Sequence, residues 1–248
     1  MKLIIDKGNT RTKIAVFKED TIHSLTVVNY LEVDFIQELL SKYDVHTTIF
    51  STVSGEENKE VMDYLAENTQ LFIMSEDLSL PIKINYLPKY SLGNDRIAAI
   101  VGGYQKFPNQ SVLVIDAGTC ICMDFVNNRA EHKGGSISLG FQIKTKALNN
   151  FTASLPLVDL DYNIPLLCSN NTIDCIKSGI VNGTIAEIQG MIDLYKKQEK
   201  ENGFQTILTG GDAKFISEQL TTTHTVEENL VLEGLNTILE YNIKNRDV

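Results

Sequence analysis

The chain has 248 residues, of which 43% are hydrophobic and 22% are charged, so it can bury a substantial core in one large or two medium domains. Its net charge of -10 and sequence pI near 4.9 argue against a broad binding surface for nucleic acid or for an anionic membrane. An anionic substrate would have to be held by local cations, backbone N–H groups and metal.

Two features of the sequence predict a cytoplasmic protein. The first residues form a strand pattern rather than a signal peptide, and no apolar run approaches the length of a membrane span. The four cysteines include no CxxC pair, so we expect reduced thiols rather than a metal cluster or a disulfide framework.

The first expected element is a pair of strands joined by a polar turn. Apolar runs at Met1–Ile5 and Ile14–Phe17 flank this turn, in which Gly8 would permit a close approach of the backbone to a ligand. Asp6 ends the first strand, where a carboxylate can hold Mg²⁺ or its water shell. Small donors suited to phosphate oxygens follow at Asn9, Thr10 and Thr12. A plain hairpin stabilised by its Asp and Asn explains this segment equally well.

Strand and helix patterns alternate after this turn. β-branched residues predict a third strand at Thr21–Val28, and apolar spacing predicts a helix at Val33–Lys42. A strand, a helix and a strand are then expected at Thr47–Thr52, Glu57–Glu67 and Leu71–Met74. Three strands, helix, strand, helix and strand is the order of a ribonuclease H-like unit with a mixed sheet.

A further helix is expected from Asn94 or Asp95 to about Tyr104. An Asp at this position commonly caps a helix or stabilises its dipole. However, Asp95 beside Arg96 also places a base and a cation together at the start of the helix, which suits catalysis. The residues alone leave both interpretations open.

The pattern of a strand ending in Asp recurs 110 residues after Asp6, at Asp116. Apolar strands are expected at Val112–Ile115 and Ile121–Val126, on either side of the turn that Asp116 begins. The recurrence predicts two copies of one unit, residues 1–108 and 109–248, with an Asp-tipped hairpin on each wall of a cleft. Two such hairpins would form a phosphate clamp.

The remaining segments complete the second copy. They are expected as helices at Gly140–Asn150, from Asn171 or Thr172 through Ile176, at Ile180–Gln198 and at Leu230–Ile243, with a loop at 157–170 and a strand at Thr206–Thr209. Capping and substrate contact are equally good explanations of Thr172. The strand at Thr206–Thr209 ends in two glycines, where the backbone can pass close to the adenosine side of a nucleotide.

Five segments, in this order, resemble the type III pantothenate kinases, which belong to the superfamily of acetate kinase, sugar kinases, Hsp70 and actin. They are DKGNTRTK from Asp6, GNDR from Gly93, DAGT from Asp116, GGSISLG from Gly134 and TGGD from Thr209. The resemblance covers nearly the whole chain. It implies an α/β fold of two ribonuclease H-like domains, with mixed five-stranded sheets flanked by helices. It also implies ATP-dependent phosphorylation of pantothenate to 4'-phosphopantothenate, the first step of coenzyme A biosynthesis.

The resemblance implies roles for individual residues. Asp95 would be the general base that takes the proton of the pantothenate hydroxyl. The expected ATP contacts are Asp6, Lys7, Gly8, Asn9, Thr10, Arg11, Thr12, Lys13 and Thr119. The expected pantothenate contacts are Tyr86, Gly93, Asn94, Asp95, Arg96 and Thr172. Asp116 matches a ligand of a monovalent cation, K⁺ or NH₄⁺, which would act beside ATP and Mg²⁺. Family members are homodimers whose pantothenate site lies at the subunit interface.

The chain departs from the family pattern at two positions. Leu139 replaces a usual proline ahead of a helix, which leaves the backbone route there open, and Cys122 lies near a usual threonine. Two alternatives remain. One is a kinase of the same superfamily for another small acceptor, and the other is a non-catalytic homologue that binds nucleotide. The chain has no GxxxxGK[ST] loop and no HRD or DFG set, which disfavours P-loop kinases and protein kinases.

Overall fold

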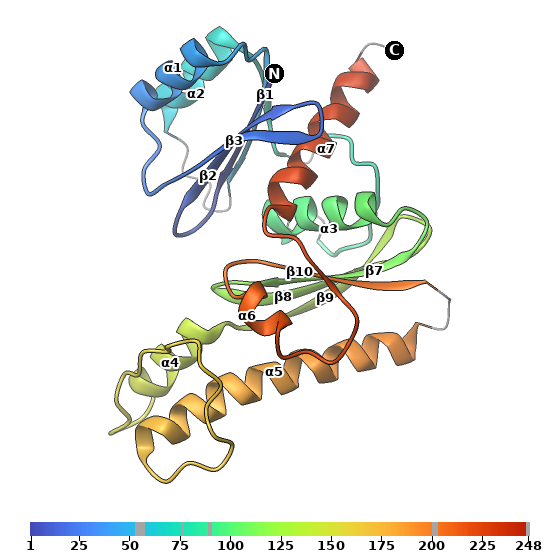
Figure 1. Ribbon diagram of the computed structural model, residues 1–248. Helices are drawn as coiled ribbons and strands as arrows, with labels where there is room; N and C mark the ends of the chain where they lie inside the picture. Colours follow the sequence, from blue (N-terminus) through green and yellow to red (C-terminus); the bar gives the residue numbers. More distant parts are fainter. Residues whose placement is uncertain (53–57, 76, 89–90, 200–202, 247–248) are drawn as a thin grey trace. The chain divides into compact units, whose positions relative to one another are not determined.

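The computed structural model describes residues 1–52, 58–75, 77–88, 91–199 and 203–246 (Figure 1). They form two compact units, one of Met1–Pro108, Ala130–His132 and Asn229–Val248, the other of Asn109–Arg129 and Lys133–Glu228. This division differs from the predicted boundaries, which placed all of 109–248 in the second domain. The segment that begins at Asn229 belongs to the first unit because the helix it forms packs against other elements of that unit.

The first unit is built on a mixed sheet with the strand order β3-β2-β1-β4-β5. Its elements are β1 (Lys2–Lys7), β2 (Thr12–Lys18), β3 (Thr21–Val28), α1 (Val33–Lys42), β4 (Thr47–Thr52), α2 (Lys59–Asn68) and β5 (Gln70–Ile73). β1 pairs antiparallel with β2 and parallel with β4. The predicted order of three strands, helix, strand, helix and strand is therefore confirmed. Glu57, the predicted start of the helix that is seen as α2, lies outside the described residues.

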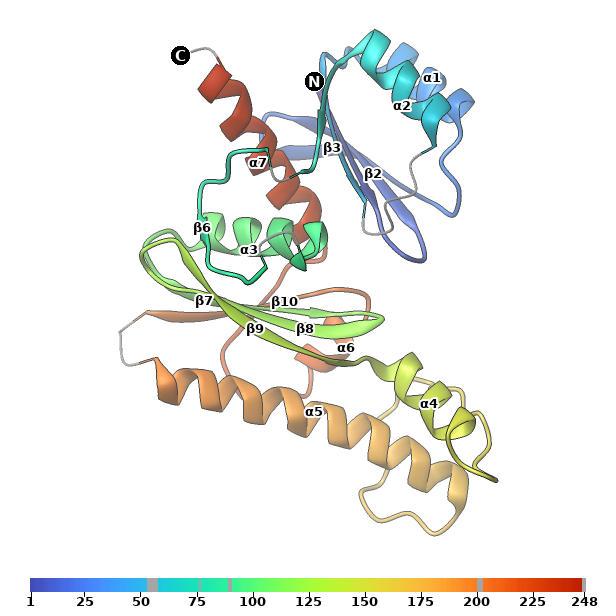
Figure 2. The same cartoon turned by 180° about the vertical axis from the view of Figure 1, so that it is seen from behind.

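Helices α1 and α2 lie side by side over one face of this sheet (Figures 1 and 2). Alternate residues of β1, Leu3 and Ile5, pack there against Ile36 of α1 and Leu65 of α2. Lys2 points to the other face, where it forms an ion pair with Glu240. The alternation of β1 therefore places Asp6 on the face of Lys2, away from α1 and α2.

Helices α3 (Asn94–Lys106) and α7 (Leu230–Arg246) pack closely together in the first unit. A Cβ on Gly234 would lie 1.8 Å from the Ala98 carbonyl oxygen, and a Cβ on Gly102 would lie 2.7 Å from the Leu230 carbonyl oxygen. Two glycines thus allow the helix backbones to touch. Helix α7 also contacts β1, β4 and β2, which explains why it belongs to the first unit.

The sheet of the second unit repeats the strand order of the first. Its strands are β7 (Ser111–Ala117), β8 (Cys120–Val126), β9 (Glu131–Leu139), β10 (Phe204–Thr209) and β11 (Thr225–Val226). They follow the order β9-β8-β7-β10-β11, which matches β3-β2-β1-β4-β5 position by position. The two-residue strand β6 (Lys83–Ile84) pairs with Glu131 and His132, so this sheet has six strands rather than the expected five.

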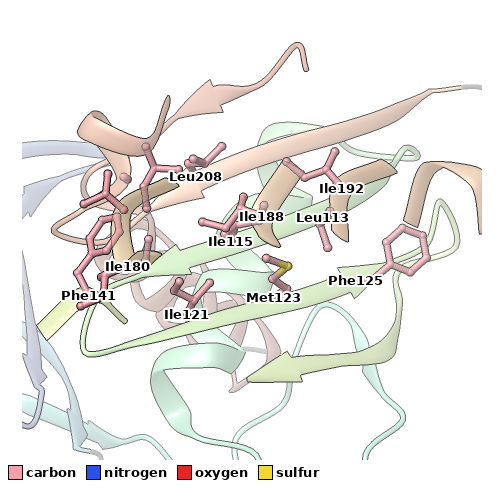
Figure 3. Packing of buried hydrophobic residues seen from close by; sticks show 14 of the residues in the cluster. Leu113, Ile115, Ile121, Met123, Phe125, Phe141, Ile180, Ile188, Ile192 and Leu208 are labelled. Carbon is pink, nitrogen blue, oxygen red and sulfur yellow. The ribbon is translucent and has the colours of Figure 1, made fainter. Parts of the chain in front are cut away.

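Helix α5 (Thr172–Gln198) lies across one face of the second sheet, and its first half contacts α4 (Phe141–Asn150). The core beneath α5 contains Leu113 and Ile115 of β7, Met123 of β8, and Ile188 and Ile192 of the helix (Figure 3). The sequence predicted two separate helices here, at about 172–176 and 180–198, whereas the structure has one continuous helix of 27 residues. A short helix α6 (Ala213–Ser217) follows β10. Within the described ranges, no helix is long and apolar enough to cross a membrane.

Candidate active site

The turn between β1 and β2 presents its polar residues outward. The hairpin closes where Lys7 pairs with Thr12, and the Gly8 N–H donates to the Arg11 carbonyl oxygen at 3.1 Å. A Cβ on Gly8 would lie 3.2 Å from that oxygen, so glycine keeps the turn compact. Exposed side chains follow at Asn9, Thr10 and Arg11. The turn therefore offers an open row of donors beyond the end of the sheet.

The strand pairing divides the predicted ATP contacts between two faces. Asp6 is opposite Lys13 on β2 and Ser51 on β4, so these three side chains start from the same face of the sheet at the strand ends. Lys7 and the buried Thr12 instead line a cavity of about 360 Å³ on the other face, together with Phe50. Only part of the predicted set thus shares the face of Asp6.

Helix α3 begins beside the end of the first sheet. The Asn94 side-chain amide donates to the carbonyl oxygens of Thr52 at 3.2 Å and Met74 at 3.3 Å. Thr52 is the last residue of β4, and Met74 directly follows β5. Thr52 pairs with Lys7 at the end of β1, so the bond to Thr52 places the start of α3 beside the strand that leads into the first turn. The structure therefore brings the GNDR segment and the Asp6 turn to one edge of the first unit.

Asp95 is the second residue of α3, where the helix dipole stabilises a carboxylate. Its Oδ1 accepts the Arg96 N–H at 2.8 Å. A Cβ on residue 93 would lie 2.5 Å from that Oδ1, so Gly93 makes room for the carboxylate. The Asp95 carboxylate can therefore take this position only because residue 93 is a glycine.

Three side chains stack next to the start of α3. The Arg96 guanidinium lies over the Tyr86 ring at 5.4 Å, and the Tyr86 ring stacks on the buried His132 with ring centroids 6.1 Å apart. The pairing of Ile84 with His132 places the histidine behind Tyr86. His132 was not predicted, since only the pairing of β6 with β9, 48 residues apart, reveals it.

The second turn, between β7 and β8, is packed on two sides by glycine backbone. A Cβ on Gly140 would lie 2.1 Å from the Gly118 carbonyl oxygen, and a Cβ on Gly210 would lie 2.4 Å from Asp116 Oδ1. The Gly140 N–H donates to the Thr119 carbonyl oxygen at 3.1 Å. The DAGT, GGSISLG and TGGD segments thus meet at one point of the second unit. Gly140 fixes the backbone route after Leu139 without the usual proline.

Thr172 lies at the start of α5. The N-cap is Asn171, whose side chain accepts the Asp174 N–H at 3.0 Å, so capping does not explain Thr172. Thr172 is exposed and lines a cavity of about 1070 Å³ with Leu139, Leu148 and Ile180. This cavity is largely apolar, with polar groups at Lys144 and at Ser169 to Thr172.

The acidic residues fit a site in which phosphate supplies most of the metal ligands. In the described part of the chain, no group of three or more His, Cys, Asp or Glu side chains is placed to hold a metal ion. Mg²⁺ in nucleotide sites commonly takes one or two carboxylates together with phosphate oxygens and waters. Asp6, at a strand end beside a row of outward donors, suits that chemistry.

Comparisons with known proteins identify the family of the chain. The family model described as type III pantothenate kinase matches residues 2–194. A type III pantothenate kinase of Azobacteroides pseudotrichonymphae is 36% identical over 98% of each chain.

Solved structures resemble the chain at lower identity, which shows the fold alone. An activator of 2-hydroxyisocaproyl-CoA dehydratase from Clostridium difficile is 11% identical, with a TM-score of 0.53 over 100% of this chain and 97% of the other. MreB5 of Spiroplasma citri, also 11% identical, gives 0.51 over 99% and 98%. The fold is that of the actin-like ATPases and sugar kinases. With its family match and near-complete coverage, the chain belongs to the type III pantothenate kinase family.

Proposed function

We propose that the chain phosphorylates pantothenate with ATP, and that Asp95 is the general base. Asp95 would take the proton of the primary hydroxyl as its oxygen attacks the γ-phosphorus, and the bond to the ADP oxygen breaks. The products are 4'-phosphopantothenate and ADP, and the reaction opens coenzyme A biosynthesis. The observation that carries the role of Asp95 is that Asn94, the residue before it, bonds Thr52, which pairs with Lys7 next to the Asp6 turn.

ATP phosphates are proposed to bind the first turn. The contacts are Asp6, Lys7, Gly8, Asn9, Thr10, Arg11, Thr12 and Lys13, with Thr119 of the second turn as a further nucleotide contact. Because the Thr12 side chain is buried on the other face, we expect it to act through its backbone. Mg²⁺ would neutralise phosphate charge, and Asp6 would hold it or its water shell.

Pantothenate is proposed to contact Tyr86, Gly93, Asn94, Asp95, Arg96 and Thr172. Arg96 is mostly buried under the Tyr86 ring, and it is the cation of this set that can pair with the pantothenate carboxylate. Asn94 already uses its amide to hold α3, so we expect its contact to be weaker than that of Arg96. A monovalent cation, K⁺ or NH₄⁺, is proposed at Asp116, whose carboxylate lies against the Gly210 backbone.

We also propose a homodimer in the cytoplasm, formed through the face of the second unit around Thr172. Large apolar residues are exposed there, with Phe151 at 87%, Leu166 at 78% and Leu167 at 80%. Such a surface marks an interaction site. A Cβ on Gly183, which lines the same cavity, would meet nothing within 4 Å, so a second copy of α5 could approach closely.

Light scattering after gel filtration tests the dimer with a matched pair of variants. Gly183→Glu should give monomers, because the new side chain would block the approach. Gly190→Glu is the control, since its Cβ also meets nothing within 4 Å but it does not line the cavity. A wild-type monomer, or a dimer that both variants keep, would refute this interface.

The central test measures ADP release with ATP, Mg²⁺ and pantothenate in potassium, ammonium or sodium salts. Turnover should need pantothenate and should be highest with K⁺ or NH₄⁺. Asp95→Asn should lower kcat by about 10²–10⁴-fold while ATP still binds. Asp34→Asn is the control, because Asp34 also occupies the second position of a helix, α1, and loses the same dipole interaction.

Other outcomes separate the alternatives. Near-normal turnover of Asp95→Asn would show that another group takes the proton. Turnover with a different small alcohol or carboxylate, but not with pantothenate, would indicate a related kinase. ATP binding without turnover on any acceptor would indicate a non-catalytic homologue.

A further inference from the structure

A tyrosine of the long loop between α4 and α5 is bonded to the loop that follows β10. The Tyr162 hydroxyl donates to Asp212 Oδ1 at 2.8 Å. The Tyr162 ring packs edge-on against Phe141 and Phe215, with centroid distances of 6.4 Å and 5.4 Å. Its backbone has φ of 53°, a left-handed conformation that is costly for a bulky residue. Several contacts therefore hold Tyr162 in one place.

Asp212 belongs to the segment that packs on the second turn. The Asp212 N–H donates to the Ala117 carbonyl oxygen at 2.9 Å. Gly210, two residues earlier, has φ of 95°, and a Cβ there would lie 2.4 Å from the same oxygen. The Gly210–Asp212 backbone thus lies directly on the turn that carries Thr119, the proposed nucleotide contact.

The environment of Asp212 explains why it needs a partner. Burial raises the pKa of the Asp212 carboxyl above its ordinary value, and the hydrogen bond from Tyr162 partly opposes that rise. A partly buried carboxylate without donors would favour a different loop conformation. Tyr162 is therefore a specific donor that holds the loop as it is seen.

Phe141 links the same pair to a third segment of the site. It follows Gly140, whose backbone abuts the second turn, and it lies in the core beneath α5 (Figure 3). Tyr162 thus packs on the start of α4 through its ring and bonds the β10 loop through its hydroxyl. Both segments contact the second turn directly.

We propose that Tyr162 and Asp212 are a positioning pair for the nucleotide. The pair holds the Gly210–Gly211 backbone against the second turn, in the conformation that receives the purine nucleoside part of ATP. Neither residue needs to touch the reacting phosphate. The inference rests on the proposed function for its kinetic readout, and it adds a determinant of ATP affinity, Tyr162, that lies in none of the five segments.

Tyr162→Phe is the main test, because it removes the hydroxyl and keeps the ring against Phe141 and Phe215. We expect the ATP KM to rise about fivefold, as for the loss of one hydrogen bond. The pantothenate KM and kcat should stay at wild-type values. A rise in both KM values together, or a fall in thermal midpoint without a change in ATP KM, would show a merely structural role.

Two further variants keep the test specific. Asp212→Asn retains an oxygen that accepts from Tyr162, so it should bind ATP nearly as well as the wild type, whereas Asp212→Ala should match Tyr162→Phe. Lys177→Met is the control for anchoring of the loop, since Lys177, on α5, forms an ion pair at 3.2 Å with Asp161, the residue before Tyr162. If Lys177→Met raised the ATP KM as much as Tyr162→Phe, the special role of the pair would be refuted.

Calorimetric titration with ATP and Mg²⁺ alone separates this inference from the proposed function. Absence of pantothenate turnover in the wild type would refute the function, yet the ATP affinities of wild type and Tyr162→Phe would still test the pair. Equal ATP affinities would refute the pair even if turnover were normal.

Discussion

The two Asp-tipped turns occupy equivalent places in the two sheets, but they are packed differently. The first spans Gly8 to Arg11, and most of its side chains are exposed. The second is shorter, and its Gly118 N–H donates to the Cys120 carbonyl oxygen. Gly140 and Gly210, from two other segments, pack directly against its backbone. The exposed side chains of the first turn can therefore contact a ligand, whereas the backbone of the second turn is fixed by the segments that pack on it.

The largest expected difference between the turns is in stability. Gly140→Ala should lower the free energy of unfolding by about 3 kcal/mol, because the new Cβ would collide with backbone oxygen of the second turn. Gly8→Ala should cost about 1 kcal/mol, since its nearest contact is only slightly tight. Urea unfolding followed by circular dichroism measures both. Equal losses would mean that the second turn is no more constrained than the first.

The next test compares the two aspartates in catalysis. Asp6→Asn should lower kcat/KM for ATP about 100-fold in any monovalent salt, because it removes a charge beside the phosphates. Asp116→Asn should instead raise the K⁺ or NH₄⁺ concentration needed for half-maximal activity. Steady-state rates over a potassium titration distinguish the two effects. The proposed division of roles fails if both variants respond to potassium alike.

A smaller effect is expected within the first turn. Lys13→Met should raise the ATP KM about tenfold, because Lys13 lies across the strands from Asp6 and would lose one charge-assisted contact. Arg11→Met should have less effect, since Arg11 is exposed at the tip of the turn. The same assay with ATP as the varied substrate measures both variants. The opposite ranking would assign the phosphate contact to Arg11.

The smallest effect concerns the support of the second turn and its dependence on pH. Lys144, in the helix that follows Gly140, donates to Glu187 at 2.7 Å. Burial alone would raise the pKa of Glu187, but hydrogen bonds from Lys144 and Ser138, with the Lys144 charge, lower it below its ordinary value. A lowered carboxyl pKa stabilises the fold above the unfolded-state pKa, and this stabilisation is lost as pH falls through the folded-state pKa.

Glu187→Gln should therefore cost about 0.5–1 kcal/mol at pH 7 and almost nothing well below the pKa of the unfolded carboxyl. Urea unfolding at several pH values gives the comparison. A Glu187→Gln penalty that does not change with pH would mean that packing, rather than charge, holds this contact.

Local patterns predicted the first unit closely. β3, α1 and β4 begin and end at the predicted residues, because their apolar periodicity is undisturbed. In the second unit, β9 was missed, since two glycines and alternating serines resemble a loop. Helix α5 was divided at Gly179, although a helix tolerates a glycine when its other face is buried in the core.

The candidate site was predictable only where a motif is local. The GNDR segment marked Asp95, but its sequence gives no sign that Asn94 bonds the ends of two strands. Tyr162 and Asp212 are 50 residues apart, and no periodicity relates them. The place of α7 in the first unit likewise depends on Gly102 and Gly234, which touch only after the chain has folded.

The position of α7 has a consequence for synthesis on the ribosome. Strands β1 to β5 and helix α3 emerge early, yet α7, which packs on α3 and on β1, is made only after the residues of the second unit. The first unit therefore cannot finish folding during translation of its own strands. A chain that stops before Leu230 would leave the α3 surface bare for chaperones and proteases, so truncated products should be cleared before they bind substrate.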